Sequence, residues 1–385
     1  MLDRGVVERM AKKYDPAGVT AACIGSHSAL DLCDGAADEG LKTLVIAQRG
    51  RDRTYSHYYK TVCDSAGRRV RGVVDTCWVV DKYAEVTLPQ RQEELRRHNA
   101  VFVPNRAFSS YVALDDIEER FQVPIFGSRQ MLRVEERGHA RDYYHLLEKA
   151  GIPFPEKVES PSKIDSLCIV KLPHAAKRLE RGFFTAASPR EFAQKSAELV
   201  RSGTITEPDL ARARIERYIV GPVFNLNMFY SPLATQGSAI ELLGVDWRFE
   251  SSLDGHVRLP AEQQLALSGS QRIPEYTVVG HNSATLRESL VEKAFELSEK
   301  FVRAAREHFA PGIIGPFCLQ TCVDKDLNFH VYDVAPRVGG GTNIHMSVGH
   351  PYANMLWRRA MSTGRRVALE IRHAATEGKL DLVVT

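Results

Sequence analysis

The sequence has no long apolar run and no closely paired cysteines. No window approaches 18 consecutive apolar residues, so the sequence predicts no membrane-spanning helix. Its seven cysteines are scattered, and none belongs to a C-x-x-C pair, which favours a reducing cytoplasm over a disulfide scaffold. The first 13 residues are charged and lack an apolar core, so we expect no signal peptide and a cytoplasmic location.

A large charge of one sign is also missing. The chain carries 51 Lys and Arg residues against 48 Asp and Glu residues, a formal net charge of +3. Proteins that wrap nucleic acid or bind membrane surfaces through charge are usually far more basic, so we expect neither kind of partner. The sequence also lacks a Walker A motif, a Gly-x-Ser-x-Gly motif and an intact Rossmann fingerprint.

What is present is the composition of an ordinary globular protein. Hydrophobic residues make up 44% of the 385 residues and charged residues 26%, and this length suggests two or three domains. An apolar run over 18–25, an amphipathic stretch that ends at Gly40 and a second apolar run over 42–48 predict a strand, a helix and a parallel strand. The region 1–130 is therefore predicted to be an α/β domain.

The pattern changes near residue 130, where we place a domain boundary. A charged helix is predicted over 135–150, because Gly151 and two prolines follow it. Apolar runs then predict a β-rich region interrupted by two helices. The expected strands are 100–104 in the first domain and, in the second, 167–172, 182–187, 213–221, 224–230, 240–245, 315–323 and 328–334; the expected helices are 189–201 and 285–308.

A short turn, Gly25-Ser26-His27, links the first strand to its helix. Backbone N–H groups at such a turn and the positive end of the helix favour an anion such as a phosphate, to which His27 could add a donor. The turn follows the carboxyl end of a strand, where open α/β sheets hold ligands. The alternative is an ordinary turn in which Ser26 caps the helix.

Lys171 stands inside an otherwise apolar strand. A buried ammonium group is costly without an anion beside it, so Lys171 needs an anionic partner. The loop 173–182 that follows adds more cations, which include Lys177 and Arg181. Such a loop can close on the charge of a triphosphate. A solvated charged hairpin is the alternative.

The strand that ends at 220–222 carries Glu216 and Tyr218. An extended edge with free backbone groups, here around Tyr218 and Ile219, can bind adenine through one N–H and one C=O, while a carboxylate accepts from a hydroxyl or an amine. Glu250 is a similar candidate farther along the chain. An ordinary strand glutamate is the alternative at each position, and the residues alone favour it.

Two late strands are expected to pair as a hairpin that carries Gln320 and Asp333. Oxygen ligands on neighbouring strands suit Mg²⁺ or Mn²⁺, because such ions take one or two protein ligands and complete their shell with water and phosphate oxygens. Arg337 then opens a glycine-rich loop over 337–343, so a metal site and a phosphate site are predicted side by side. A hairpin with a polar inner face and a mobile loop is the alternative.

The order of these elements resembles that of the ATP-grasp ligases. Longer strings are similar to the archaeal formate-dependent 5-formaminoimidazole-4-carboxamide ribonucleotide (FAICAR) synthetase family and cover nearly the whole chain. They include Gly25-Ser-His-Ser-Ala-Leu, Arg248-Phe-Glu-Ser, Gly312-Ile-Ile-Gly-Pro-Phe-Cys-Leu-Gln and Ser362-Thr-Gly-Arg-Arg. The resemblance implies a mixed α/β and α+β protein with an ATP-grasp fold and an N-terminal, Rossmann-like α/β domain.

The resemblance also divides the chain into functional parts. It implies that 1–130 is the side of the nucleotide substrate and that 131–385 forms the ATP-grasp region. Within that region, 151–215 would be the small subdomain and 216–385 the subdomain that binds ATP and metal. A homo-trimer or homo-hexamer is expected on the same ground.

The activity that the resemblance implies belongs to purine biosynthesis. ATP activates formate as formyl phosphate, the 5-amino group of aminoimidazole carboxamide ribonucleotide (AICAR) attacks it, and FAICAR, ADP and phosphate leave. By position, His27 and Arg337 would act at the reacting groups, with Gly25 and Ser26 on the nucleotide substrate. The ATP set would be Lys171, Lys177, Arg181, Glu216, Tyr218, Ile219 and Glu250, and the Mg²⁺ or Mn²⁺ set would be Gln320 and Asp333.

Three departures from the family pattern bear on the substrates. Loop 173–182 replaces a glycine-rich loop, Ala107 stands where the family has a serine, and His281, followed by Asn282, stands where it has an asparagine. We expect a 5′-phosphorylated ribonucleotide still to bind, and AICAR to bind more weakly than in relatives. Two alternatives stay open: a paralogue that acts on another ribonucleotide or carboxylate, and a nucleotide-binding regulator without catalysis.

Overall fold

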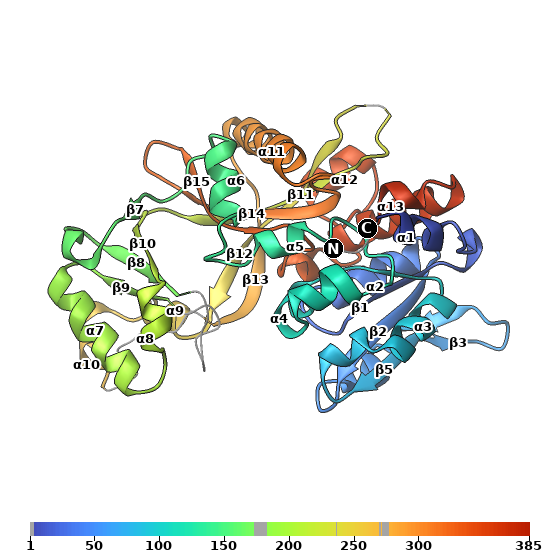
Figure 1. Cartoon of the computed structure of the whole chain (residues 1–385), viewed down its shortest axis with the longest axis horizontal. Coiled ribbons are helices and arrows are strands. Elements are labelled where there is room, and N and C mark those ends of the chain that lie inside the picture. Colours follow the sequence, from blue (N-terminus) through green and yellow to red (C-terminus); the bar gives the residue numbers. More distant parts are fainter. Residues whose placement is uncertain (1–3, 173–182, 236, 269–270, 272–276) are drawn as a thin grey trace.

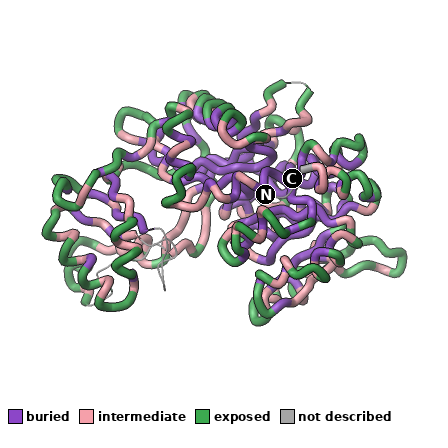
Figure 2. The backbone as a smooth tube through the Cα atoms, viewed as in Figure 1, coloured by how far each residue is buried: buried purple, intermediate pink, exposed green. Residues whose placement is uncertain are grey.

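The structure is a computed structural model that describes residues 4–172, 183–235, 237–268, 271 and 277–385. Three sheets follow one another along the long axis of the molecule (Figure 1). A two-stranded hairpin of β3 (Val62–Cys63) and β4 (Arg69–Arg71) lies near the first sheet. Buried segments are concentrated in the first sheet and the central sheet (Figure 2).

The first sheet is parallel, with strand order β5-β2-β1-β6. Alternate residues of β1 enter two different core clusters, so both faces of the sheet are covered, as parallel sheets require. The predicted strand, helix and parallel strand over 18–48 are confirmed. The elements are β1 (Thr20–Ile24), α2 (Ala29–Asp38), β2 (Lys42–Gln48), β5 (Thr76–Val80) and β6 (Ala100–Phe102), with helices α1 (Arg4–Ala11), α3 (Pro89–Arg97) and α4 (Arg106–Tyr111).

The end of the chain returns to the first sheet. Helix α13 (Thr363–Thr376) packs along α2, and its apolar residues belong to the same core cluster. Thr385 exchanges both backbone hydrogen bonds with Ile125, at 2.9 and 3.1 Å. The first sheet is therefore stabilised by residues from both ends of the sequence, while the division at residue 131 stays a prediction.

The smallest of the three sheets is antiparallel and has the order β7-β10-β8-β9. Helix α7 begins where Ser188 accepts a hydrogen bond from the Glu191 N–H (3.2 Å), as an N-cap serine does. This sheet carries Lys171 and Glu216 on adjacent strands. Its elements are β7 (Lys157–Val158), β8 (Cys168–Lys171), β9 (Phe183–Ala186), α7 (Pro189–Arg201), α8 (Glu207–Ala211) and β10 (Arg214–Arg217).

The central sheet is antiparallel, with strand order β13-β12-β11-β14-β15. A core cluster under α6 and α11 buries one of its faces. Strand β12 runs on to Glu250, beyond the expected end at residue 245. The elements are α6 (Tyr143–Lys149), β11 (Val223–Tyr230), β12 (Ile240–Glu250), β13 (Val278–Ala284), α11 (Glu288–His308), β14 (Gly315–Val323) and β15 (Phe329–Ala335), with short helices α5 (Met131–Val134), α9 (Ser251–His256), α10 (Ala261–Ala266) and α12 (Pro351–Trp357).

The helix expected over 135–150 is wrong in its first half, because the helix that forms there, α6, begins at Tyr143. Gly138 has a left-handed φ of +86°, which interrupts a helix. Asp142 then caps the new helix by accepting from the N–H groups of Tyr144 (3.0 Å) and His145 (3.3 Å). The residues before it form turns instead, and two of them reach the site described below.

No helix within the described ranges is long and apolar enough to cross a membrane. The seven cysteines are all free thiols. The cytoplasmic location stays a prediction.

Candidate functional site

A cavity that is partly open to solvent lies between the first sheet and the central sheet. His27 contributes from the turn after β1, His281 from β13 and Gln320 from β14. Arg337 and the glycines that follow it form one wall. The structure therefore brings together four of the residues that the sequence singled out, although up to 310 positions separate them in the chain.

The glycine-rich segment packs closely against the cavity residues, and at Gly341 a side chain would not fit. A Cβ at Gly341 would lie 2.4 Å from Asp246 Oδ1 and 2.5 Å from His281 Nδ1, closer than carbon atoms approach such groups. At Gly340 the nearest atom, His27 Nδ1, would be 3.8 Å away. The Ser28 hydroxyl donates to the Gly339 carbonyl (2.5 Å) and ties this segment to the start of α2.

The predicted hairpin is confirmed, since β14 and β15 pair and Gln320 lies opposite Asp333. Both side chains are buried. Asp333 Oδ2 is 3.5 Å from the guanidinium of Arg137, and Gln320 Oε1 accepts a hydrogen bond from Arg248 (3.0 Å). Two side-chain oxygen ligands on paired strands fit Mg²⁺, because this ion needs few protein ligands. Within the described residues no group of three or more His, Cys, Asp or Glu side chains offers another metal site.

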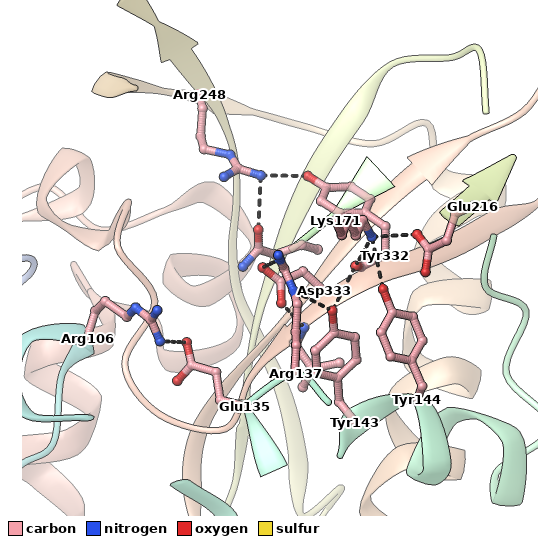
Figure 3. A network of polar contacts seen from close by, with 12 residues as sticks. Arg106, Glu135, Arg137, Tyr143, Tyr144, Lys171, Glu216, Arg248, Tyr332 and Asp333 are labelled. Atoms are coloured by element: carbon pink, nitrogen blue, oxygen red, sulfur yellow. Dashed lines mark hydrogen bonds and ion pairs between the residues drawn. The ribbon is translucent and has the colours of Figure 1, made fainter. Parts of the chain in front are cut away.

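Lys171 has the anionic partner that its position in an apolar strand requires. Its Nζ lies 2.6 Å from Glu216 Oε2 and donates to the Tyr144 hydroxyl and the Tyr332 carbonyl, each at 3.0 Å (Figure 3). Burial lowers the pKa of Lys171, against the attraction of Glu216. Arg214 also contacts Glu216, at 2.6 Å. The expected contact of Lys171 with ATP stays a prediction beside this observed ion pair.

Four arginines lie around Gln320, Asp333 and the cavity, and the sequence singled out just one of them, Arg337. Arg337 lies 2.5 Å from the carboxylate of Glu135. Arg106 contacts the same carboxylate at 3.0 Å (Figure 3). Arg248 donates to the Tyr332 hydroxyl (2.8 Å), and Arg137 donates to that of Tyr143 (3.1 Å). Such a concentration of cations suits phosphate groups. Arg248 lies in a string that carried the family resemblance, but nothing local to Arg137 points to Asp333.

Asp246 is a further residue of the site that the sequence did not reveal. It has no exposed surface, and its carboxylate accepts from His281 Nδ1 (2.8 Å), Asn225 Nδ2 (2.8 Å) and Asn227 Nδ2 (2.6 Å). Burial alone would raise the pKa of Asp246, but these hydrogen bonds hold it below its ordinary value. The alternation of polar residues on β11 and β12 is the signal that could have found this cluster.

Two residues of the Gly25-Ser26-His27 turn already use their backbone groups in hydrogen bonds. The Gly25 N–H donates to the Ile46 carbonyl (2.8 Å), and the Ser26 carbonyl accepts from the Ala29 N–H (2.9 Å). Ser28, with a φ of 65°, precedes the first residue of α2, so the alternative in which Ser26 caps the helix is wrong.

Other predicted residues lie away from the cavity. Ala107 is buried in the core of the first sheet, and its neighbour Arg106 lines the cavity instead. Asn282 is exposed on β13, and Tyr218 is 44% exposed just after β10. Ile219 lies beside it, and Glu250 ends β12. Lys177 and Arg181 lie outside the described residues.

Two sequence-family profiles match the chain. A protein of unknown function (DUF1246) matches residues 21–158, and a domain of unknown function (DUF1297) matches residues 191–385. A curated relative from Methanopyrus kandleri, named 5-formaminoimidazole-4-carboxamide-1-(beta)-D-ribofuranosyl 5'-monophosphate synthetase, is 39% identical over 386 residues and covers 100% of both chains. A relative of the same name from Methanobrevibacter smithii is 38% identical over 97% of this chain and 96% of its own.

Solved structures agree with these relatives. An IMP biosynthesis protein, PurP, from Thermococcus kodakaraensis matches with a TM-score of 0.68 and 29% identity, over 95% of this chain and 100% of its own. A biotin carboxylase in complex with ATP from Campylobacter jejuni, at 13% identity and a TM-score of 0.56 over 91% of this chain and 70% of its own, shows the fold alone. The predicted ATP-grasp fold is confirmed. Because full-length relatives share well over 30% of its residues, the chain belongs to the FAICAR synthetase family.

Proposed function

We propose that this protein is an ATP-dependent carbon–nitrogen ligase that formylates AICAR. Formate and ATP give formyl phosphate and ADP, and the 5-amino group of AICAR then displaces phosphate to give FAICAR. The observation that carries the proposal is the single cavity in which His27 and His281 face the same space as Gln320 and Arg337. An acceptor and an activated phosphate need such a common chamber.

ATP is assigned to the side of the small sheet. Lys171 and Glu216 lie on adjacent strands there, and Glu250 ends β12 of the central sheet. An incoming phosphate oxygen would compete with Glu216 for the ammonium of Lys171, which is buried and already desolvated. The backbone groups around Tyr218 and Ile219 would bind adenine. Mn²⁺ is an alternative to Mg²⁺ as the ion that Gln320 and Asp333 would hold.

Gln320 and Asp333 would hold the magnesium ion. Their oxygens fit it because they face each other across one strand pair, and phosphate oxygens would supply the remaining ligands. When bound, the ion neutralises charge on the transferring phosphoryl group. Arg137 then loses its partner at Asp333 and is available for phosphate.

Arg337 and His27 are assigned to the reacting groups. The carboxylate of Glu135 fixes the Arg337 guanidinium in the cavity wall, which prepares it for an anion. Formyl phosphate hydrolyses readily, so the walls of the cavity must also exclude water during transfer. His27 would contact the nucleotide substrate from the turn after β1.

One observation favours a second candidate, a paralogue with a different acceptor. The family resemblance places an asparagine where this chain has His281, and an imidazole bonded to a buried carboxylate is a different partner for a substrate amide. The substrate of this alternative would be a related ribonucleotide whose amine lies beside a group other than the carboxamide of AICAR. Calorimetric binding of AICAR against other ribonucleotide monophosphates separates the two.

The experiment that tests the ligase is positional isotope exchange in ATP labelled with ¹⁸O at the β,γ-bridge. Reversible formation of formyl phosphate predicts that label scrambles when formate and Mg²⁺ are present and AICAR is absent. A protein that binds ATP but shows no formate-dependent scrambling and no product would contradict the proposal. The homo-trimer or homo-hexamer belongs to the proposal as well, and sedimentation velocity measures it.

A further inference from the structure

The contact between Asp246 and His281 fixes which nitrogen of the histidine carries a proton. The carboxylate of Asp246 accepts from both Asn225 and Asn227 and can only accept from the ring, so His281 Nδ1 must donate across the 2.8 Å contact. In a neutral ring, His281 Nε2 then bears the free lone pair. A buried carboxylate that orients an imidazole in this way is a common device for placing a base.

His281 Nε2 faces the cavity. It lies 4.0 Å from the point where a Cβ at Gly340 would stand, and His27 Nδ1 lies 3.8 Å from the same point. The two imidazoles therefore face one space beside the glycine-rich segment, with Gln320 on the wall of the same cavity. Asp246 contacts His281 directly, through its Nδ1 atom.

We propose that His281 Nε2 accepts the proton of the attacking amine during formyl transfer and that Asp246 is its positioning residue. The inference rests on the proposed function. As the amine nitrogen bonds to the formyl carbon, the bond from that carbon to the phosphate oxygen breaks and its electron pair leaves with phosphate. The proton that the amine loses goes to His281 Nε2, so atoms and charge balance without another reagent.

A base is needed because the amine of an aminoimidazole is conjugated with the ring and is a weak nucleophile. Its proton becomes acidic only as the carbon–nitrogen bond forms, and a positioned base then speeds the step by about 10²- to 10⁴-fold. Formyl phosphate formation needs no such base, because formate is already an anion. The two half-reactions should therefore respond differently to a change at His281.

The test compares the two half-reactions in the His281→Gln variant. Formyl phosphate is trapped with hydroxylamine as the hydroxamate, and FAICAR formation from AICAR is followed separately. We expect hydroxamate formation to stay within about threefold of wild type and FAICAR formation to fall by about 100-fold or more. Equal FAICAR rates in variant and wild type, or an equal loss of both half-reactions, would overturn the inference.

A matched control exists elsewhere in the chain. His330 Nε2 lies 2.9 Å from Asp324 near the turn between β14 and β15. This second aspartate–histidine pair does not line the cavity. His330→Gln should change neither half-reaction. Asp246→Asn should lower kcat for FAICAR formation at least tenfold with little change in the KM for AICAR, because an amide no longer fixes the ring nitrogen. A change confined to KM would overturn the positioning role.

The same assays separate this inference from the proposed function. If wild-type protein gives no formate-dependent hydroxamate, the proposed function fails and the role of His281 fails with it. If wild type gives hydroxamate and FAICAR, and His281→Gln gives both at wild-type rates, the proposed function stands and the role of His281 is overturned.

Discussion

Lys171 and Glu216, on adjacent antiparallel strands, form a 2.6 Å ion pair in which neither side chain is more than 5% exposed. A buried pair of this kind contributes little net stability, but the loss of one partner leaves an uncompensated charge. Tyr144 and the Tyr332 carbonyl complete the surroundings of the ammonium group. The ammonium group of Lys171 is thus held in a fixed position at the place assigned to ATP.

Substituting Lys171→Met removes this charge and keeps the volume of the stem. We expect Mg-ATP to raise the melting temperature of the wild type and not of the variant, because ligand stabilisation follows RT ln(1 + [L]/Kd). The variant itself should also be less stable, by less than the roughly 3–5 kcal/mol of an uncompensated buried charge, because Arg214 still contacts Glu216. Lys163→Met, which disrupts an exposed pair with Glu159, is the control. An unchanged ATP-induced shift in Lys171→Met would leave Lys171 a structural residue.

Asp333→Ala should abolish turnover while the protein remains folded. A metal ligand acts mainly on transition-state charge, so its loss is expected to cost about 3 kcal/mol or more of barrier. Circular dichroism checks the fold, and ADP release measures the rate. Asp326→Ala, at an exposed position of the same hairpin, is the control. Wild-type turnover by folded Asp333→Ala would remove the metal assignment.

Neighbouring glycines should respond differently to the same substitution. Gly341→Ala places a Cβ within 2.5 Å of Asp246 and His281, whereas Gly340→Ala meets nothing closer than 3.8 Å. We expect Gly341→Ala to lose about 1–3 kcal/mol of unfolding free energy and most activity, and Gly340→Ala to keep its stability. Urea denaturation measures both. Equal stability of the two variants would show that the segment does not pack as described.

Asp31 offers a test of pH dependence. Its carboxylate is fully buried and accepts from the Gly364 N–H (2.9 Å), and burial raises the pKa of Asp31 from 3.8 to about 6 against the effect of that and other hydrogen bonds. The folded state therefore binds more protons than the unfolded state between these values, so stability falls as pH rises from about 4 to 6.

Asp31→Asn removes this titration with almost no change of shape. The variant should be more stable than wild type at pH 8, by up to about 3 kcal/mol, and should show no such gain near pH 4. Thermal unfolding across this range measures the difference, with Asp326→Asn as the exposed control. A gain that is the same at both pH values would contradict the assigned shift.

Local patterns in the sequence predicted the elements that carry the site. The apolar runs around Gly40 predicted two strands and a helix, and the turn before Asn328 predicted the hairpin that places Gln320 opposite Asp333. These features depend on residues close in the chain. The need of Lys171 for an anion was also foreseen, because a cation in an apolar strand is costly wherever its partner lies.

Contacts between distant residues could not be predicted in the same way. Arg137 contacts Asp333, which lies 196 positions away in the chain. The segment of Arg137 was expected to be helical, but Gly138 interrupts that helix and Asp142 caps a new one after it. The Asp246 cluster depends on the register of three strands, which no local pattern specifies. Ala107 was expected at the substrate because the family resemblance places a serine there, yet its methyl group packs in the core.

The most direct test of the ligase is the formation of ADP and FAICAR from Mg-ATP, formate and AICAR, with each component omitted in turn. The proposed activity predicts ADP and FAICAR in equal amounts when all three are present, and no FAICAR above background when formate or AICAR is left out. Folded protein that binds ATP yet forms no ADP with all three present, or that forms ADP without FAICAR, would contradict the account.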